Sequence, residues 1–421
     1  MVFHPRDPGW RRGALNRREL LRMVSGAGLS ASLASCGSTA GFATDDRRRV
    51  LIGTPENPVQ HPLFDDNPPI DSGLDIEPGP LRIFNWADYV HIPVLNAFSE
   101  RYGVDWEYTT FYNNEEAIRK LRTKAGRFDV FFPPIEQVPK CIGGQLLQPL
   151  NHTYLPNLAN VWPSLVSPFY DQGARYTVPY GVYQTGITWR EDMVTPDLEA
   201  MTNPWHVFWD PQYDGIAGMY DDFRETIGVG LYATGTNDIN TADPELLENA
   251  RRKLLELIDL INVRFTIDGA YAKIAERGFA IHHAWSGDVV QAQAYFPQGE
   301  DPSVMRYFWP PRSEQSSAGG MVSVETFAIP RNAEHPVLAH HFINFMLETE
   351  NALSNFGWSG NPPPLRTLNP ETFVSEGHIP PNLATTITTE DDFLIGQLPI
   401  QLSPEIEIEW MKVWASVQSG G

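Results

Sequence analysis

This 421-residue sequence has few cysteines and few positively charged residues. It holds 2 cysteines, so disulfide bonds are not its main source of stability. Its 31 lysines and arginines stand against 52 acids, a formal net charge of -21. This excludes a nucleic-acid partner, because an acidic chain cannot neutralise a row of phosphates. Hydrophobic residues make up 42% of the chain, and the length suggests two or three folded domains.

Motifs of common catalytic sites are also missing. The sequence has no Walker phosphate loop, no Gly-x-Ser-x-Gly elbow and no His-Glu-x-x-His motif. Gly228, Gly230 and Gly235 make only a fragment of a dinucleotide fingerprint. The adjacent histidines at 282–283 and 340–341 point in different directions on a helix or a strand. We therefore predict a protein that is not an enzyme and needs no cofactor or metal.

Residues 1–36 have the layout of an export signal. Arginines, including the pair Arg17–Arg18, precede a weakly apolar run over 23–35 that is shorter than the roughly 20 residues of a membrane span. The stretch 16–21 resembles a twin-arginine signal, and 33–36 resembles a lipobox, whose cysteine is acylated. We expect export to the periplasm or cell surface, with a lipid on Cys36 as the membrane attachment. A basic tail with a buried helix is the alternative.

Residues 37–80 are rich in proline, glycine and aspartate and show no sustained periodicity, which predicts a flexible tether. From residue 81 onward, strands and helices alternate. A helix opened by Pro93 and a helix capped by Asn114 separate three expected strands, at 81–84, 104–109 and 128–132. This order is typical of a parallel sheet covered on both faces.

The alternation of strands and helices returns further along the chain. Asp243 caps a long expected helix, Pro336 opens another, and strands are expected at 279–281 and 325–329. Cys141 is expected to be a buried thiol. Roughly 340 residues exceed one hydrophobic core. We predict two α/β lobes, formed by residues 81–185 with 325–366 and by residues 186–324 with 367–421.

Acids beside aromatic residues stand near the ends of four expected strands. They occur at Trp86–Asp88, Asp221–Glu225 and Trp285–Asp288, and at Glu325. Ligands bind outside the carboxyl ends of strands in open α/β sheets, so these acids would form a negatively charged cleft. Each position also has a plain structural explanation. Asp222 can cap a helix, and Glu225 can pair with its neighbour Arg224 or cap the local turn.

The stretch 81–90 resembles the opening strand of the polyamine-binding proteins of spermidine/putrescine ABC importers. Further segments follow in that family's order and approximate spacing, at 128–133, 178–187, 285–289, 327–330 and 342–345. The resemblance covers roughly residue 81 to the end. It implies a two-lobed periplasmic-binding-protein fold of type II, an α/β fold with the ligand cleft between the lobes. It also implies a monomer that captures a polyamine, putrescine or spermidine, and delivers it to an ABC permease.

The resemblance further implies eight ligand-binding residues. Two aromatics flank the methylene chain, and two acids correspond to positions that meet an ammonium group or grip a terminal amine. Three acids match further acidic positions of the family, and one more aromatic stands near the cleft. In that order they are Trp86 and Trp285; Asp88 and Glu325; Asp222, Glu225 and Asp288; and Trp358. A polyamine alternates cations with CH₂ groups, so carboxylates at intervals with flat rings between them suit it. Carboxylates that repel each other in the empty cleft would also favour closure over a bound cation.

Four positions depart from the family pattern. Ala87 lacks a hydroxyl that is common after the first tryptophan, and Pro134 stands where serine is frequent. Ser323 replaces the tryptophan of the spermidine type, which would widen the pocket, and Glu136 replaces an aromatic and would add negative charge. The identity of the amine therefore stays open. Alternatives are another cationic or zwitterionic solute such as a betaine or a basic amino acid, a carboxylate-pair glycosidase, or a structural surface lipoprotein.

Overall fold

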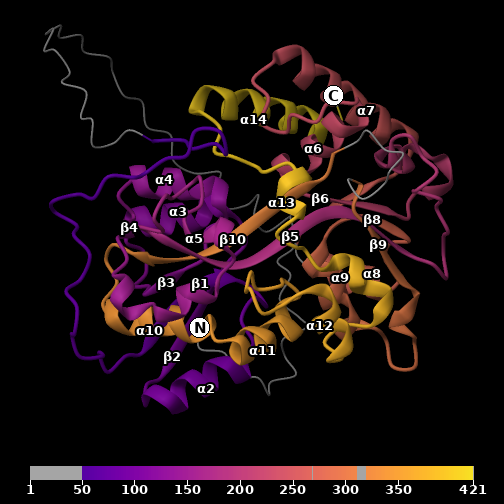
Figure 1. Ribbon diagram of the computed structural model, residues 1–421. Helices are drawn as coiled ribbons and strands as arrows, with labels where there is room; N and C mark the ends of the chain where they lie inside the picture. Colours follow the sequence, from indigo (N-terminus) through magenta and orange to yellow (C-terminus); the bar gives the residue numbers. More distant parts are fainter. Residues whose placement is uncertain (1–49, 268, 311–318, 421) are drawn as a thin grey trace, which may run out of the picture. The chain divides into compact units, whose positions relative to one another are not determined.

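The computed structural model describes residues 50–267, 269–310 and 319–420 (Figure 1). The predicted export signal, the lipidation site Cys36 and the first part of the predicted tether lie outside the described residues. Within the described ranges, no helix combines the length and the apolar composition that crossing a bilayer requires.

A mixed β-sheet runs through the body that begins at Val50. Its strand order is β2-β1-β3-β10-β5-β8-β6-β7, with β4 paired to β10 and β9 to β5. The strands are β1 (Leu81–Trp86), β2 (Trp106–Phe111), β3 (Val130–Phe131), β4 (Leu147–Gln148), β5 (Thr177–Arg190), β6 (Ala217–Tyr220), β7 (Arg264–Thr266), β8 (Ile281–Trp285), β9 (Met305–Phe308) and β10 (Met321–Pro330).

The parallel sheet predicted from strand–helix alternation is confirmed on both sides of the sheet but not at its centre. β1 pairs in parallel with β2 and β3, and β6 pairs in parallel with β7 and β8. The long strands β5 and β10 pair antiparallel between these two groups. Every residue of β10 is buried, and β5 is buried along most of its length. These two strands therefore connect both halves of the sheet through its interior, as Figure 1 shows.

Helices cover the sheet. They are α2 (Ile92–Tyr102), α3 (Asn114–Thr123), α4 (Val138–Gly143), α5 (Pro163–Val166), α6 (Phe223–Ala233), α7 (Pro244–Leu260), α8 (Ala270–Ala275), α9 (Ser286–Ala292), α10 (Pro336–Met346), α11 (Thr349–Ser359), α12 (Pro370–Ser375), α13 (Asp392–Ile395) and α14 (Pro404–Ser419). A short 3₁₀ helix, η3 (Ile135–Gln137), follows β3. The helix α14 packs on α6 and α7.

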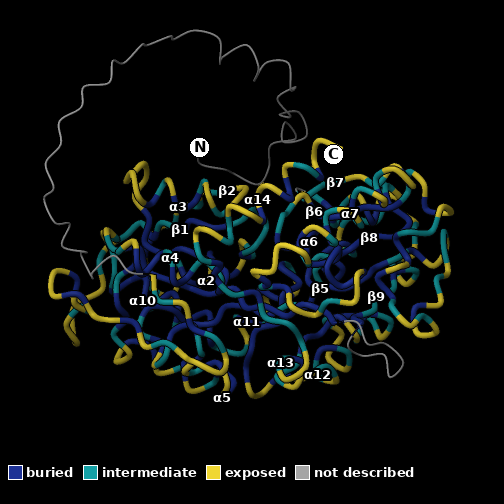
Figure 2. The backbone as a smooth tube through the Cα atoms, turned by 90° about the horizontal axis from the view of Figure 1, so that it is seen from above, coloured by how far each residue is buried: buried dark blue, intermediate teal, exposed yellow. Residues whose placement is uncertain are grey.

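Hydrophobic side chains form separate cores in the two halves of the sheet. One core gathers around β1 and β3 and includes Phe84, whose ring stacks on Phe128 at 4.1 Å. Other cores gather around β6, β8 and α6 and contain the fully buried Trp205 and Trp410. The buried backbone, dark blue in Figure 2, runs through both regions. Separate cores are consistent with two lobes, and the predicted boundaries between the lobes stay predictions.

Several predicted element ends shift by a few residues. The cap of α3 is Asn113, not Asn114, because the Asn113 side chain accepts the Glu116 N–H at 2.8 Å. The cap of α7 at Asp243 is confirmed, since its carboxylate accepts the Glu245 N–H at 2.8 Å. Cys141 is fully buried, as expected. The strand expected at 279–281 begins at its last residue and continues to Trp285, and the strand expected at 325–329 is the middle of β10.

The prediction of a flexible tether over 37–80 is wrong for its described part, residues 50–80, which we call the N-terminal strap. Asn67 Nδ2 donates to the Leu147 carbonyl at 2.8 Å, and the Glu77 carboxylate accepts the Leu338 N–H at 2.8 Å. The strap therefore lies fixed along the body. A segment without periodicity can be ordered when its polar side chains find backbone partners on a neighbouring surface, which composition alone does not reveal.

Candidate functional site

The first candidate residues follow the carboxyl end of β1. Trp86 is the last residue of β1, is partly exposed, and packs its ring against Phe111 at 4.6 Å. Asp88 lies in the left-handed backbone region, at φ 58°. Its Oδ2 accepts the hydroxyl of Tyr271 at 2.9 Å. Asp88 therefore ties the loop after β1 to α8, which stands 183 residues further along the chain.

Asp222 and Glu225 take different roles at the start of α6. The Asp222 carboxylate caps the helix by accepting the N–H groups of Arg224 at 2.8 Å and Glu225 at 3.1 Å. The plain structural role predicted for Asp222 is thus present. The alternative for Glu225 is a pair with Arg224. Among the described residues, no hydrogen bond joins these two side chains. The Arg224 guanidinium donates instead to Asn240 Oδ1 at 2.6 Å and to the Ile400 carbonyl at 3.0 Å.

The buried Glu225 carboxylate holds the Trp285 side chain in place. Its Oε1 accepts the indole N–H of Trp285 at 2.6 Å and the Thr185 hydroxyl at 3.3 Å. Its Oε2 lies 3.3 Å from Nε2 of His283. A carboxylate with three side-chain partners has a fixed position, so the orientation of the indole plane is also fixed.

Trp285 and Asp288 are joined through Tyr220, the last residue of β6. The Trp285 and Tyr220 rings stack at 4.0 Å with an interplanar angle of 21°. The Tyr220 hydroxyl donates to Asp288 Oδ2 at 2.7 Å and accepts the backbone N–H of Trp285 at 2.8 Å. Burial raises the pKa of Asp288 to about 7, against the hydrogen bond from Tyr220, which lowers it.

Glu325 stands in the middle of β10, which corrects the expectation that it lies near a strand end. It faces Gly181 of β5 and also bridges to Pro134. Only 4% of Glu325 is exposed, and its Oε2 has no hydrogen-bond partner among the described residues. Burial, helped by the charge of Glu136, raises the pKa of Glu325 well above its usual range.

The predicted acids form one electrostatic group in the described structure. Asp288 lies within electrostatic reach of Glu225, and Asp222 lies within reach of Glu225 as well. Tyr89 is within reach of Asp288 and Glu325. Burial, then repulsion from Glu225, raises the pKa of Asp222 to about 6. Residues from the loop after β1, from α6, α9 and β10 therefore converge.

Trp358 makes a ring contact with His91. It lies on α11 and stacks its ring on His91 at 5.5 Å, with an interplanar angle of 12°. His91 directly precedes α2 and follows Tyr89 by two residues. The structure thus connects Trp358 to the segment after β1 through His91, and its predicted role in binding stays a prediction.

Sequence reasoning missed the tyrosines of this site. Tyr89, Tyr183, Tyr220 and Tyr271 each lie within reach of at least two of the acids. The signal for two of them was present, because Tyr89 follows Asp88 directly and Tyr220 directly precedes the acid pair at 221–222. Tyr271 has no local signal, since only the tertiary fold brings α8 to Asp88.

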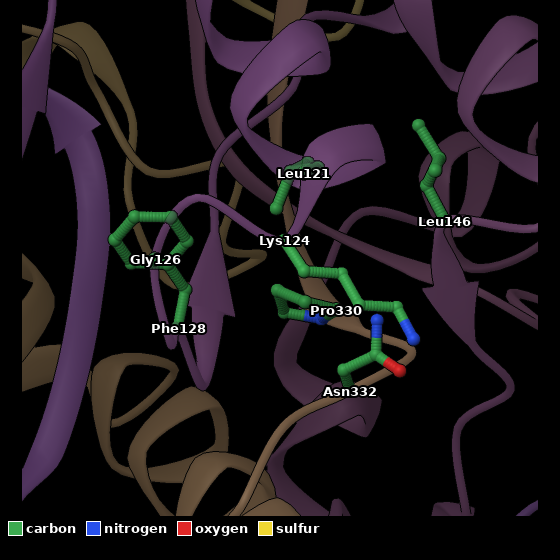
Figure 3. Close-up of a pocket in the computed structure, with 7 residues that line it drawn as sticks. All are labelled: Leu121, Lys124, Gly126, Phe128, Leu146, Pro330 and Asn332. Carbon is green, nitrogen blue, oxygen red and sulfur yellow. The ribbon is translucent and has the colours of Figure 1, made fainter.

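Figure 3 shows a pocket whose lining includes none of the predicted acids. It is small, about 20 Å³, which suits a single water molecule. Lys124 and Asn332 supply its polar groups, and the lining residues are Leu121, Lys124, Gly126, Phe128, Leu146, Pro330 and Asn332. None of the predicted site residues lines it, so it is not the candidate site.

Comparison with known proteins assigns the family. Residues 94–381 match the family described as bacterial extracellular solute-binding protein. The chain belongs to this family. Its members bind solutes, whereas the sequence alternatives of a glycosidase or a structural lipoprotein belong to other classes.

Relatives of this solute-binding protein carry more specific names. The spermidine/putrescine-binding periplasmic protein of Escherichia coli K12 is 28% identical over 296 residues, covering 69% of this chain and 80% of the relative. The putrescine/cadaverine-binding protein of Pseudomonas aeruginosa is 27% identical over 289 residues, covering 67% of this chain and 79% of the relative.

Solved structures share the fold of this solute-binding protein. A putative spermidine/putrescine ABC transporter from Listeria monocytogenes superposes with a TM-score of 0.67 at 24% identity, covering 80% of this chain and 98% of the other. The Tp0655 lipoprotein of Treponema pallidum has a TM-score of 0.66 at 25% identity, with the same coverage. The fold is the two-lobed α/β fold of periplasmic binding proteins, as the sequence predicted.

Proposed function

We propose that this protein captures a linear polyamine outside the membrane and delivers it to an ABC permease. The observation that carries the proposal is a group of acids around Trp285 and Tyr183. Glu225 accepts the Trp285 indole N–H, and Asp222 and Asp288 lie within electrostatic reach of Glu225. Glu325 and Glu225 both lie within reach of Tyr183. Relatives named as spermidine/putrescine-binding and putrescine/cadaverine-binding proteins support the same ligand class.

The chemistry of the site suits ammonium groups separated by CH₂ groups. Asp288 and Glu325 are the principal anchors in this proposal. Glu325 has a buried oxygen without a hydrogen-bond partner in the described part of the chain, and Asp288 accepts the Tyr220 hydroxyl. A charge-assisted hydrogen bond contributes about 1.5–3 kcal/mol. The Trp285 ring face adds about 0.5–2 kcal/mol for a cation lying over it. Two anchors and one ring together contribute about 3.5–8 kcal/mol before the cost of association. Micromolar affinity corresponds to about -8 kcal/mol, so burial of the ligand's CH₂ groups has to supply the remainder.

Isothermal titration of the purified protein tests the proposal. Putrescine, cadaverine and spermidine are titrated separately, with glycine betaine, arginine and a neutral sugar as comparison ligands. We expect saturable binding of at least one polyamine at micromolar or better affinity. Tight binding of betaine or arginine alone would assign the protein to another cationic or zwitterionic solute. No heat with any of the polyamines would refute the proposal.

The cellular placement in this proposal is a lipid-anchored monomer at the outer side of the membrane. The lipobox at 33–36 and the arginine pair at 17–18 support an exported lipoprotein acylated at Cys36. A Cys36→Ser substitution tests this placement, because it removes the acylated thiol. We expect the variant to leave the membrane fraction, while ligand binding is retained. Equal membrane association of both proteins would overturn the anchor.

A further inference from the structure

Glu136 is held next to Glu325 by backbone contacts. It lies in η3, two residues after Pro134, which forms an isolated β-bridge with Glu325. The next residue of β10, Thr326, donates both its N–H, at 3.1 Å, and its hydroxyl, at 2.7 Å, to the carbonyl of Pro133. The segment that carries Glu136 is therefore fixed against the strand that carries Glu325.

Both glutamates present an oxygen that protein groups do not satisfy. Oε2 of Glu136 and Oε2 of Glu325 are buried and have no hydrogen-bond partner among the described residues. Glu325 as a whole is 96% buried, since 4% of it is exposed. Two neighbouring buried carboxylates repel each other, and a cation between or beside them removes that penalty.

One protein cation, Arg224, lies near this charge. Glu136 lies within electrostatic reach of Asp222 and Glu225 as well as of Arg224. The Arg224 guanidinium, however, already donates to Asn240 and to the Ile400 carbonyl. Glu136 thus adds negative charge to an acidic group whose neighbouring cation has other hydrogen-bond partners.

Two tyrosines lie near more than one of these carboxylates. Tyr89 lies within electrostatic reach of Asp288 and Glu325, and Tyr183 lies within reach of Glu325 and Glu136. The register of β5 and β10 pairs Tyr183 with Ser323, two residues before Glu325 on the same face of the sheet. Each ring is thus near two of the three carboxylates of Asp288, Glu325 and Glu136, and Tyr183 is also near Glu225.

We propose that Glu136 is a third carboxylate for the ligand, beyond Asp288 and Glu325, and that it makes the site prefer linear triamines over linear diamines. This inference rests on the proposed polyamine function. A diamine has two ammonium groups, which Asp288 and Glu325 accommodate. The third ammonium group of a triamine meets Glu136, and its CH₂ groups lie beside Tyr183.

Titration of the Glu136→Gln variant with spermidine and putrescine tests the inference. The substitution keeps the shape of the side chain and removes its charge. At pH 8 we expect the affinity for spermidine to fall at least tenfold and the affinity for putrescine to fall less than threefold. Glu136→Asp, which retains the charge, is expected to keep a preference for spermidine. Glu100→Gln, an equal charge change at an exposed position of α2, is expected to change neither affinity.

Two outcomes separate this inference from the proposed function. Wild-type protein that binds neither amine would refute the polyamine function itself. Wild-type protein that binds both amines, with the same affinity ratio in Glu136→Gln, would refute only the role of Glu136. Thermal unfolding of the variants checks their folding, and the midpoint of Glu136→Gln is expected at or above that of the wild type, because a buried unpaired charge is removed.

Discussion

Glu225 and Asp288 illustrate two uses of a buried carboxylate in one site. The Glu225 carboxylate interacts with the side chains of Trp285, Thr185 and His283, so both of its oxygens have partners within the protein. Asp288 has the Tyr220 hydroxyl on one oxygen. The polyamine resemblance treated both as ligand acids. The structure favours Asp288 as the group that meets a ligand and Glu225 as the group that orients the indole.

Replacing Asp288 with asparagine should therefore weaken amine binding. Asparagine still accepts the Tyr220 hydroxyl but loses the charge, so about 1.5–3 kcal/mol of charged hydrogen bonding is lost. We expect the Kd for the best polyamine to rise about 10- to 150-fold in isothermal titration. Glu256→Gln, an equal charge change on an exposed residue of α7, is the control and should leave Kd unchanged. An unaltered Kd in Asp288→Asn would remove Asp288 from the binding site.

At the scale of elements, the hydrogen bond from Tyr271 to Asp88 joins α8 to the loop after β1. The two segments come from opposite ends of the strand order, next to β7 and at β1. A contact of this kind stabilises the arrangement in which both halves approach the site. Asp88, which accepts the hydrogen bond from Tyr271, has a positive φ.

Tyr271→Phe should accelerate ligand release. The variant loses one charge-assisted hydrogen bond, which contributes about 1.5–3 kcal/mol. Part of this free energy is gained only when α8 and the loop after β1 are in contact. We expect a rise in the dissociation rate of about 3- to 30-fold in stopped-flow displacement, with a smaller change in the association rate. Tyr112→Phe, at an exposed tyrosine, is the control. Equal dissociation rates for Tyr271→Phe and wild type would mean that the contact does not restrain the ligand.

The N-terminal strap has its own structural role at this scale. Glu77 accepts the N–H groups of Val337 at 3.1 Å and Leu338 at 2.8 Å, at the first turn of α10. The residue at the cap position, His335, forms no side-chain cap of its own. A strap residue thus supplies the helix cap from 260 positions earlier in the chain.

Glu77→Ala should destabilise the fold by about 0.5–2 kcal/mol, the usual cost of losing a helix cap. Equilibrium unfolding in urea measures this free energy as a lower midpoint at an unchanged slope. Asp75→Ala removes an exposed acid of the same strap and should have a smaller effect. Identical midpoints for Glu77→Ala and wild type would show that the strap does not support α10.

For the molecule as a whole, buried acids tie stability to pH. Burial raises the pKa of Asp288 and of Glu136 to about 7 and that of Asp222 to about 6. Such groups bind more protons in the folded state than in the unfolded state between about pH 4 and 7. Their contribution to the free energy of unfolding therefore falls as pH rises through this window. A bound cation favours their ionised forms, so ligand affinity should rise over the same range.

Thermal unfolding of ligand-free wild type and Asp288→Asn, followed from pH 5 to pH 8, measures this linkage. Other titrating groups are common to both proteins and cancel in the difference. We expect the unfolding midpoint of Asp288→Asn relative to wild type to increase as pH rises, because only the wild type must ionise Asp288. A difference that stays constant across the range would show that Asp288 does not titrate near neutral pH.

Local sequence patterns determined the family, the alternation of elements and the positions of most site acids. Helix caps, hydrophobic periodicity and acids beside aromatics depend on neighbours within a few residues, so Asp243 as a cap and Trp285 at a strand end could be predicted. The resemblance then supplied candidate roles for Asp88, Asp288 and Glu325. The strap was mistaken for a tether because its partners lie far along the chain.

The tertiary structure alone decided which of these residues come close together and which buried oxygens lack a hydrogen-bond partner among the residues that the structure describes. Residues far apart in sequence determine burial, cross-strand register and the contact between α8 and the loop after β1. A pattern within a few neighbouring residues does not reveal which distant residues meet. This is why the contact of Tyr271 with Asp88 and the bridge between Pro134 and Glu325 became visible only in the fold. The raised pKa values follow from the same burial, since desolvation depends on what surrounds a carboxylate in space.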